Sequence, residues 1–373
     1  MTQSLHYVIQ PASSGCIGTK KSIAEEALVA LRRSSKILII LGVGFLILAA
    51  VIRFLVVPAM AKLPGSVDVT ARYEGTGTLL NAAALQAGDF GNVIASDVPV
   101  SVDRHIYVSE TAGDNAVAHD DITVSSPGGV SLPSNHTYVL DRRTMDAGGT
   151  VSGTEVEQHA GLTIGLPLYP DAAEEFSLYD SATKTTVPLT YVDSGTVSGR
   201  DVLNYVAQAQ GSLQDPAILA ALPPALPKSQ LAGLAPLLPA DLQAKLGPAL
   251  AMLPDPVPFN YTAVSKVSLS ADQTLGTPID GALNQQVIAN VEVDGQNVSL
   301  IPVLALDTKL TEQSVADAAS AAASQSRMLF LLSVVTPIVL AALGVVLIAV
   351  ALMRRRASTP ASAQEIRTEE SRV

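Results

Sequence analysis

Three side chains that could bind a metal ion alternate along one short stretch of the sequence: Glu155, Glu157 and His159. Residues 154–159 favour a β-strand, and alternate residues of a strand point to the same face. Two carboxylates and an imidazole on one face could hold a divalent cation and support a metal-dependent enzyme. The simpler interpretation, which we prefer, is that they form the solvated face of a half-buried strand.

No other group of residues in the sequence has the spacing of a familiar catalytic site. The sequence contains no nucleophile elbow, P-loop, zinc-binding pair on a helix, dinucleotide fingerprint or EF-hand loop. None of the five histidines stands at a metal-ligand spacing from another, and Cys16 is the one cysteine. The sequence therefore predicts a protein that is not an enzyme and that uses no cofactor.

Two long apolar segments, residues 37–57 and 328–353, enclose most of the chain. Each is long enough for a helix to cross the hydrocarbon core of a bilayer, which is about 30 Å thick. Lys and Arg collect before the first segment and after the second, as they do on cytoplasmic flanks. We therefore predict a two-pass plasma-membrane protein with cytoplasmic segments 1–36 and 354–373, and with residues 61–327 outside the cytoplasm.

A cleaved signal peptide is the alternative interpretation of the first apolar segment. Ala59-Met60-Ala61 follows this segment and has the small residues of a cleavage site. However, the apolar run is longer than the usual core of a signal peptide, and the stretch that precedes it is also long. We favour a retained membrane anchor.

The chain is acidic, with a formal net charge of −11. Most of its Asp and Glu residues lie between the two apolar segments, so this region repels phosphate and is not expected to bind nucleic acid. The same region has no cysteine, so a hydrophobic core must stabilise it without disulfide bonds. Membrane lipids are the expected partners, with a second copy of the chain as a further candidate.

The region between the spans has the pattern of an α+β fold dominated by antiparallel strands. Residues 61–214 and 259–310 carry short alternating runs separated by Gly, Asn, Asp and Pro. Asp294-Gly295 between two such runs predicts a two-residue hairpin. These predicted strands are shorter than the roughly 10-residue strands of a membrane-spanning barrel.

Three of the predicted strands end in an aspartate with a threonine shortly after it. They are the strands that end at Asp141, Asp180 and Asp272. An aspartate at the first position of a turn accepts hydrogen bonds from the backbone amides that follow it. We therefore predict three turns capped by carboxylates and not a carboxylate cluster.

Residues 215–258 interrupt the β pattern with an insertion rich in Leu, Pro and Ala. Short helices are predicted at residues 217–222, 229–235 and 240–253. The last carries an apolar stripe at helical spacing, formed by Leu242, Leu246, Leu250 and Leu253. This stripe either packs on the parent sheet or forms the apolar wall of a ligand site. Residues 311–327 are rich in alanine and predict a membrane-proximal helix that leads into the second span.

Several segments along the chain resemble those of a known family. They are residues 53–58 (RFLVVP), 73–78 (YEGTGT), 138–144 (YVLDRRT), 161–167 (GLTIGLP) and 176–180 (FSLYD). Together with the two spans, these segments resemble the actinobacterial porin PorA family of two-anchor cell-envelope proteins. The resemblance implies an envelope location and, by the family's name, a pore.

The sequence leaves several functions open. The leading hypothesis is a non-catalytic cell-envelope protein whose outer domain binds or shuttles an apolar envelope component, such as a lipid or glycolipid. The alternatives are an oligomeric channel or channel-assembly factor and, further, an envelope scaffold or sensor. Two helices cannot line a pore unless several chains assemble, so the channel hypothesis requires a homo-oligomer.

Overall fold

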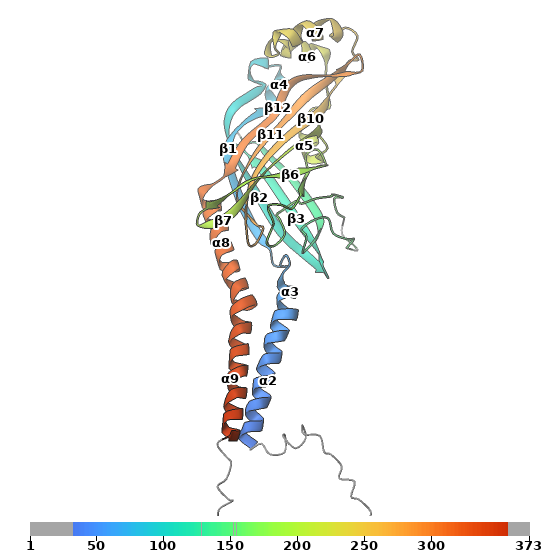
Figure 1. The fold of residues 1–373 in the computed structure, drawn as a ribbon. Coiled ribbons are helices and arrows are strands. Elements are labelled where there is room, and N and C mark those ends of the chain that lie inside the picture. The colour runs from blue at the N-terminus through green and yellow to red at the C-terminus, as the bar shows by residue number, and fades with distance from the viewer. Residues whose placement is uncertain (1–32, 128, 152, 154, 357–373) are drawn as a thin grey trace, which may run out of the picture. The chain divides into compact units, whose positions relative to one another are not determined.

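The computed structural model describes residues 33–356, apart from residues 128, 152 and 154. It divides into two compact units, and each is described here by itself (Figure 1). One contains the chain up to Leu55 and from Ser333 onward, and the other is Val56–Leu332. Most of the predicted cytoplasmic segments, residues 1–32 and 357–373, lie outside the described residues.

The first unit is a pair of antiparallel helices, α2 (Arg33–Val51) and α9 (Thr336–Arg356) (Figure 1). By length and composition, two helical ranges could each cross a membrane, Arg33–Met60 and Glu312–Arg354. The helices α2 and α9 approach closely at two glycines: a Cβ at Gly42 would lie 2.7 Å from the carbonyl oxygen of Gly344, and the reverse also holds. Small residues allow such close backbone packing between helices in lipid.

Each apolar helix contains one wide π-helical turn, and each such turn lies just before a proline. These turns are η1 (Ile52–Val56), followed by Pro58, and η4 (Leu331–Val335), followed by Pro337. Proline has no N–H, and its ring clashes with the carbonyl of the preceding turn. A local widening of the helix relieves this clash, so the prolines explain the π turns without ending the helices.

The second unit is built on one antiparallel sheet of ten strands that curls around its own core (Figure 1). The strand order is β4-β3-β2-β1-β12-β11-β10-β7-β6-β5. The strands are β1 (Asp68–Leu80), β2 (Ile94–Ala112), β3 (Asn115–Ser125), β4 (Ser131–Asp141), β5 (Phe176–Asp180), β6 (Thr185–Val197), β7 (Arg200–Ser212), β10 (Asn260–Asp272), β11 (Pro278–Val293) and β12 (Gln296–Leu310). The predicted α+β class, dominated by antiparallel strands, is confirmed.

The strands are longer than the sequence predicted. β2 has 19 residues and β11 has 16, whereas the sequence predicted only a shorter run within each of them. Each of these strands is hydrogen-bonded on both sides, so its backbone stays extended through residues of low strand propensity. The strand predicted over residues 154–159 is absent, because residues 155–160 form no regular element.

The local turn predictions are confirmed. Val293 pairs with Gln296 around Asp294 and Gly295, which both have positive φ as a tight hairpin requires. The carboxylates of Asp141, Asp180 and Asp272 each accept a hydrogen bond from a backbone amide two or three residues later. These aspartates therefore shape turns.

The helices α6 (Lys228–Leu234) and α7 (Ala240–Leu250) of the insertion lie near one end of the sheet (Figure 1). Between them is η3 (Ala235–Leu237), and the two-residue strands β8 (Ala225–Leu226) and β9 (Val257–Pro258) flank this group in the sequence. The first helix of the insertion, α5 (Pro216–Ala221), precedes β8 and contacts β4. The remaining helices are α3 (Val57–Met60), α4 (Ala82–Ala87), η2 (Phe90–Asn92) and α8 (Glu312–Phe330). The hydroxyl of Thr311 caps α8, which packs Ala319 and Ala322 on the sheet.

Gly75→Ala tests the close pairing of β1 with β12. A Cβ at this position would overlap the carbonyl oxygen of Asp307, so the strands must separate. We expect the free energy of unfolding to fall by about 1–3 kcal/mol, measured by denaturant titration of the full chain in detergent. The control is Gly211→Ala in β7, where the nearest side-chain atom is at an ordinary 3.5 Å. Equal losses in the two variants would contradict the close pairing.

Candidate functional site

A cavity of about 200 Å³ lies inside the curled sheet. Its walls come from β1–β4 on one side and β10–β12 on the other, and β5, β6, residues 162–166 and α5 complete it. The volume has room for on the order of fifteen water-sized probes. Most of the lining is apolar, including Val102, Ile122, Leu304 and Leu306. The cavity is therefore large enough for a small organic molecule or part of a chain-like one.

Charged side chains enter this apolar interior because they occupy the inward positions of alternating strands. Inward residues of β2 include Val102, Arg104 and Ile106, and those of β3 include Asp120 between alanines and Ile122. On β4, Ser134 and His136 take the inward phase. The sequence analysis missed these residues, although a charge in the apolar phase of a strand is a usable signal for a buried polar site.

Arg104 and Asp120 form a bidentate ion pair in the cavity wall. The guanidinium donates from Nε to Oδ1 at 2.8 Å and from Nη2 to Oδ2 at 2.6 Å. Nη2 also donates to the carbonyl oxygen of Thr163 at 3.2 Å. Burial acts to lower the pKa of Arg104, but the charge and hydrogen bonds of Asp120 outweigh it and raise that pKa. Both oxygens of Asp120 are thus occupied by Arg104.

His136 is held between two acidic groups, and only 3% of the residue is exposed. Its Nδ1 donates to Oε2 of Glu157 at 2.9 Å. Its Nε2 lies 3.0 Å from Oγ of Ser134, which donates to Oδ2 of Asp215 at 2.6 Å. Because Ser134 uses its proton for Asp215, it accepts from Nε2, and both ring nitrogens carry protons.

The charges of this group support that protonation state. Burial acts to lower the pKa of His136, but Asp215 and Glu157 more than offset this and raise it to about 9. Burial acts to raise the pKa values of both carboxyls, yet hydrogen bonds from His136 and other donors hold them below their ordinary values. Near neutral pH the group is therefore an imidazolium between two carboxylates.

Ser134, His136 and Glu157 follow one another in the order of a serine-histidine-acid triad, yet the protons are in the wrong places for acyl transfer. A general base must take the proton of the serine through a neutral imidazole nitrogen. Here the imidazole is protonated and the serine proton points to Asp215. The arrangement holds the wall together and does not activate a nucleophile.

The same histidine stabilises the place where the sheet closes on itself. The edge strands β4 and β5 are joined through an irregular segment: the amide of Glu157 donates to Thr137, and Leu162 exchanges backbone hydrogen bonds with β5. The side chain of Glu157 repeats this link, because Oε2 accepts from His136 and Oε1 accepts from the hydroxyl of Tyr179 at 2.7 Å. We call the segment of residues 155–166 the seam.

Two hydroxyl groups in the cavity lining have no protein partner. Oγ of Ser265, on β10, and Oγ1 of Thr163, in the seam, are both buried without a hydrogen bond. Only 2% of Ser265 is exposed. An unmet buried hydroxyl costs free energy unless something in the cavity pairs with it, so these two groups are the natural contacts for a ligand.

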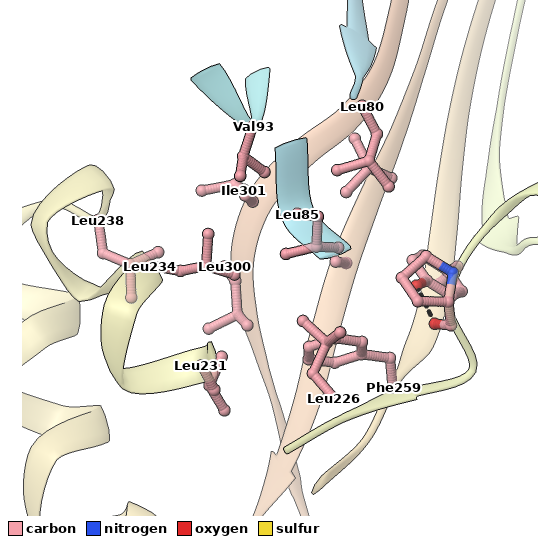
Figure 2. Close-up of a pocket in the computed structure, with 14 residues that line it drawn as sticks. Leu80, Leu85, Val93, Leu226, Leu231, Leu234, Leu238, Phe259, Leu300 and Ile301 are labelled. Atoms are coloured by element: carbon pink, nitrogen blue, oxygen red, sulfur yellow. Dashed lines mark hydrogen bonds between the residues drawn. The ribbon is translucent and has the colours of Figure 1, made fainter. Parts of the chain in front are cut away.

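The four leucines predicted as an apolar wall lie elsewhere. Leu246 is buried in a cluster with Leu231, Leu238 and Leu300, and Leu242, Leu250 and Leu253 pack around it. None of the four lines the large cavity or a second, apolar pocket of about 20 Å³ beside α6. That pocket holds on the order of one water-sized probe and is ordinary core packing (Figure 2).

Figure 2 shows how the insertion packs: Leu234 and Leu238 face Leu300 of β12. Leu231 belongs to the same buried cluster as Leu300. Packing on the parent sheet is what the structure shows for this segment. Ligand contact by Leu242, Leu246, Leu250 and Leu253 stays a prediction.

Glu155, Glu157 and His159, the possible metal ligands, have different surroundings in the structure. Glu157 is occupied by His136 and Tyr179, Glu155 is exposed, and the ring of His159 packs 5.0 Å from that of Tyr138, centroid to centroid. Within the described part of the chain, no three His, Cys, Asp or Glu side chains are grouped to hold a metal ion. The alternation failed as a guide because residues 155–160 are not a strand.

Comparison with known proteins gives one strong match and several weak ones. The sequence profile of a family described as Porin PorA matches residues 34–353. No protein with a curated description matches the chain.

Among solved structures, peroxisomal multifunctional enzyme type 2 from Drosophila melanogaster is 13% identical, with a TM-score of 0.13, over 69% of this chain and 40% of that one. A MaoC-like dehydratase from Phytophthora capsici is 9% identical, with a TM-score of 0.14, over 65% and 72%. The double-hotdog protein Rv0216 from Mycobacterium tuberculosis is 13% identical, with a TM-score of 0.13, over 71% and 80%. The chain spans about two fifths of the Drosophila enzyme, and similarities this weak carry no argument.

The pH dependence of stability tests the charge state of His136. A histidine whose pKa is raised stabilises the fold fully below its unfolded value of 6.5, and this contribution is lost as the pH rises through about 9. Over that window we expect the wild-type free energy of unfolding to fall by on the order of 3 kcal/mol and the fall to be absent in His136→Gln. Denaturant titration across the pH range measures both.

His159→Gln provides the contrasting control for that experiment. Burial lowers the pKa of His159, so its loss should improve stability below about pH 6.5 and leave the alkaline slope unchanged. A His136→Gln variant that keeps the wild-type alkaline slope would contradict a protonated His136.

Proposed function

Because the chain belongs to the PorA porin family, we propose that it is a membrane-anchored protein of the cell envelope whose β-rich unit binds an apolar envelope molecule, such as a lipid or glycolipid. Two helices anchor it in the plasma membrane, with both termini in the cytoplasm and the β-rich unit on the other side. The molecule would bind in the cavity inside the curled sheet. The observation that carries the proposal is this cavity of about 200 Å³ with its largely apolar lining.

The arrangement of the charges supports binding and not catalysis. In the wall, Arg104 is paired with Asp120 and His136 with Glu157, and this histidine, which could serve as a base, is already protonated. A catalytic site needs at least one group free to exchange a proton or attack a substrate. We therefore propose a non-catalytic role.

An oligomeric channel, or a factor that assembles one, is the second candidate. The family match favours it, as does the close packing at Gly42 and Gly344, which shows that these apolar helices can pair tightly. The cavity of the β-rich unit does not itself favour ion passage, because its walls are mostly apolar. Several copies of the chain would have to supply the walls of a pore.

Filling the cavity tests the first proposal. Val267 lines the cavity from β10, so Val267→Phe should occupy part of it. We expect apolar molecules to co-purify with the wild-type chain in mild detergent and their amount per chain to fall about tenfold in the variant, as mass spectrometry of the extracted molecules measures. The matched control is Val206→Phe on the neighbouring strand β7, where the side chain is exposed. Equal recovery from both variants would rule out this cavity as the binding site.

Planar bilayer recordings separate the two candidates. If the β-rich unit binds an apolar molecule and the chain forms no pore, purified wild-type protein should give no more conductance steps than a mock preparation. Reproducible unitary steps would favour the channel, and Gly42→Leu, which separates the two helices, should then abolish them.

A further inference from the structure

We infer that the cavity accepts an uncharged ligand with a hydroxyl or carbonyl oxygen and rejects free fatty acids, although an arginine stands in its wall. This inference rests on the proposed function and specifies its ligand class. Neutral lipids, fatty alcohols and esters have this chemistry. The inference follows from which polar groups of the wall are already paired and which are not.

Arg104 offers no unbalanced positive charge to an anionic ligand. Its Nε and Nη2 donate to Asp120, and Nη2 also donates to the carbonyl of Thr163, so the buried aspartate already balances the charge of the guanidinium. A carboxylate that bonded to Nη1 would lose its water without gaining an unpaired cation, and one that replaced Asp120 would leave that aspartate buried without its partner. Either route costs more than the new contact could supply.

The two carboxylates beside His136 are also occupied. Both oxygens of Glu157 are occupied by His136 and Tyr179. In Asp215, Oδ2 accepts from Ser134, while Oδ1 accepts from the amides of Ala217 and Ile218 at the start of α5. Because the carboxylates of this wall outnumber its cations, its net charge is negative and repels the carboxylate of a free fatty acid.

The fully buried polar side-chain atoms of the lining that lack a hydrogen bond both belong to hydroxyls. Ser265 Oγ and Thr163 Oγ1 are buried without partners, and they come from β10 and from the seam. A hydroxyl can both donate and accept, so it satisfies an alcohol or an ester carbonyl equally well, but it cannot neutralise an ion. A neutral oxygen on an otherwise apolar molecule is the partner that removes this cost.

Dodecanol, dodecanoate and dodecane differ only in the head that this site would recognise. Each is offered to the full chain in the same detergent, and its binding is followed by native mass spectrometry. Because all three ligands partition into micelles, variants are compared with the wild type at one detergent concentration.

We expect dodecanol to bind best near pH 7. In Ser265→Ala, the affinity for dodecanol should fall about tenfold, toward the affinity for dodecane, because the variant lacks the hydroxyl that pairs with the ligand. Ser194→Ala, on the exposed face of β6, should leave all three unchanged.

Asp120→Asn provides the opposite test. It removes the negative charge that balances Arg104, so the affinity for dodecanoate should rise about tenfold or more while the affinity for dodecanol changes little. If this variant does not fold, the wild type supplies the same comparison: dodecanoate should gain affinity as acidification removes its charge, and dodecanol should not.

Each outcome decides a different statement. Dodecanoate binding to the wild type as well as dodecanol, or an unchanged dodecanol affinity in Ser265→Ala, would overturn the inference and leave the proposed function standing. Failure of all three ligands to bind the wild type would instead overturn the proposed function.

Discussion

The closed form of the sheet depends on the buried ion pairs that the imidazolium of His136 makes with Glu157 and Asp215. Through Glu157 the imidazolium joins the edge strand β4 to the seam, and through Ser134 and Asp215 it joins the same strand to the start of α5. One charge thus ties together segments that are far apart in the sequence. Removal of the imidazolium would leave two buried carboxylates without their cation, which costs roughly 3–5 kcal/mol.

This constraint also determines what the cavity can bind. The polar groups that close the sheet are used by one another, so they contribute structure and no recognition. What remains for a ligand is the apolar lining and the two hydroxyls of Ser265 and Thr163. A wall with several charged residues can therefore have the binding character of an uncharged site, because hydrogen-bond partners and not residue types decide availability.

The sequence was informative where structure is local and uninformative where distant segments meet. The turn at Asp294 and the carboxylate caps at Asp141, Asp180 and Asp272 follow from neighbouring residues and were predicted. Arg104, Asp120 and His136 were not predicted as one site: Arg104 lies inside a predicted strand, whereas Asp120 and His136 stand just before the apolar runs by which their strands were recognised. In the sheet, pairing with neighbouring strands keeps these residues extended, on both sides for Arg104 and Asp120 and on one side for His136 in the edge strand β4. Glu157 was singled out by type, but its partners come from β4 and β5 and not from Glu155.

Strand length alone does not make this sheet a membrane barrel. At 19 and 16 residues, β2 and β11 exceed the roughly 10 residues that a tilted strand needs to cross a bilayer. The outward face of β1, however, carries Asp68, Arg72 and Glu74, all exposed, and Arg72 pairs with Asp103 of β2 at 2.8 Å. Each Arg or Lys facing the middle of a bilayer costs roughly 2–4 kcal/mol. The outward face of these strands therefore suits water, and within residues 33–356 the two long apolar helical ranges are the segments that suit contact with lipid.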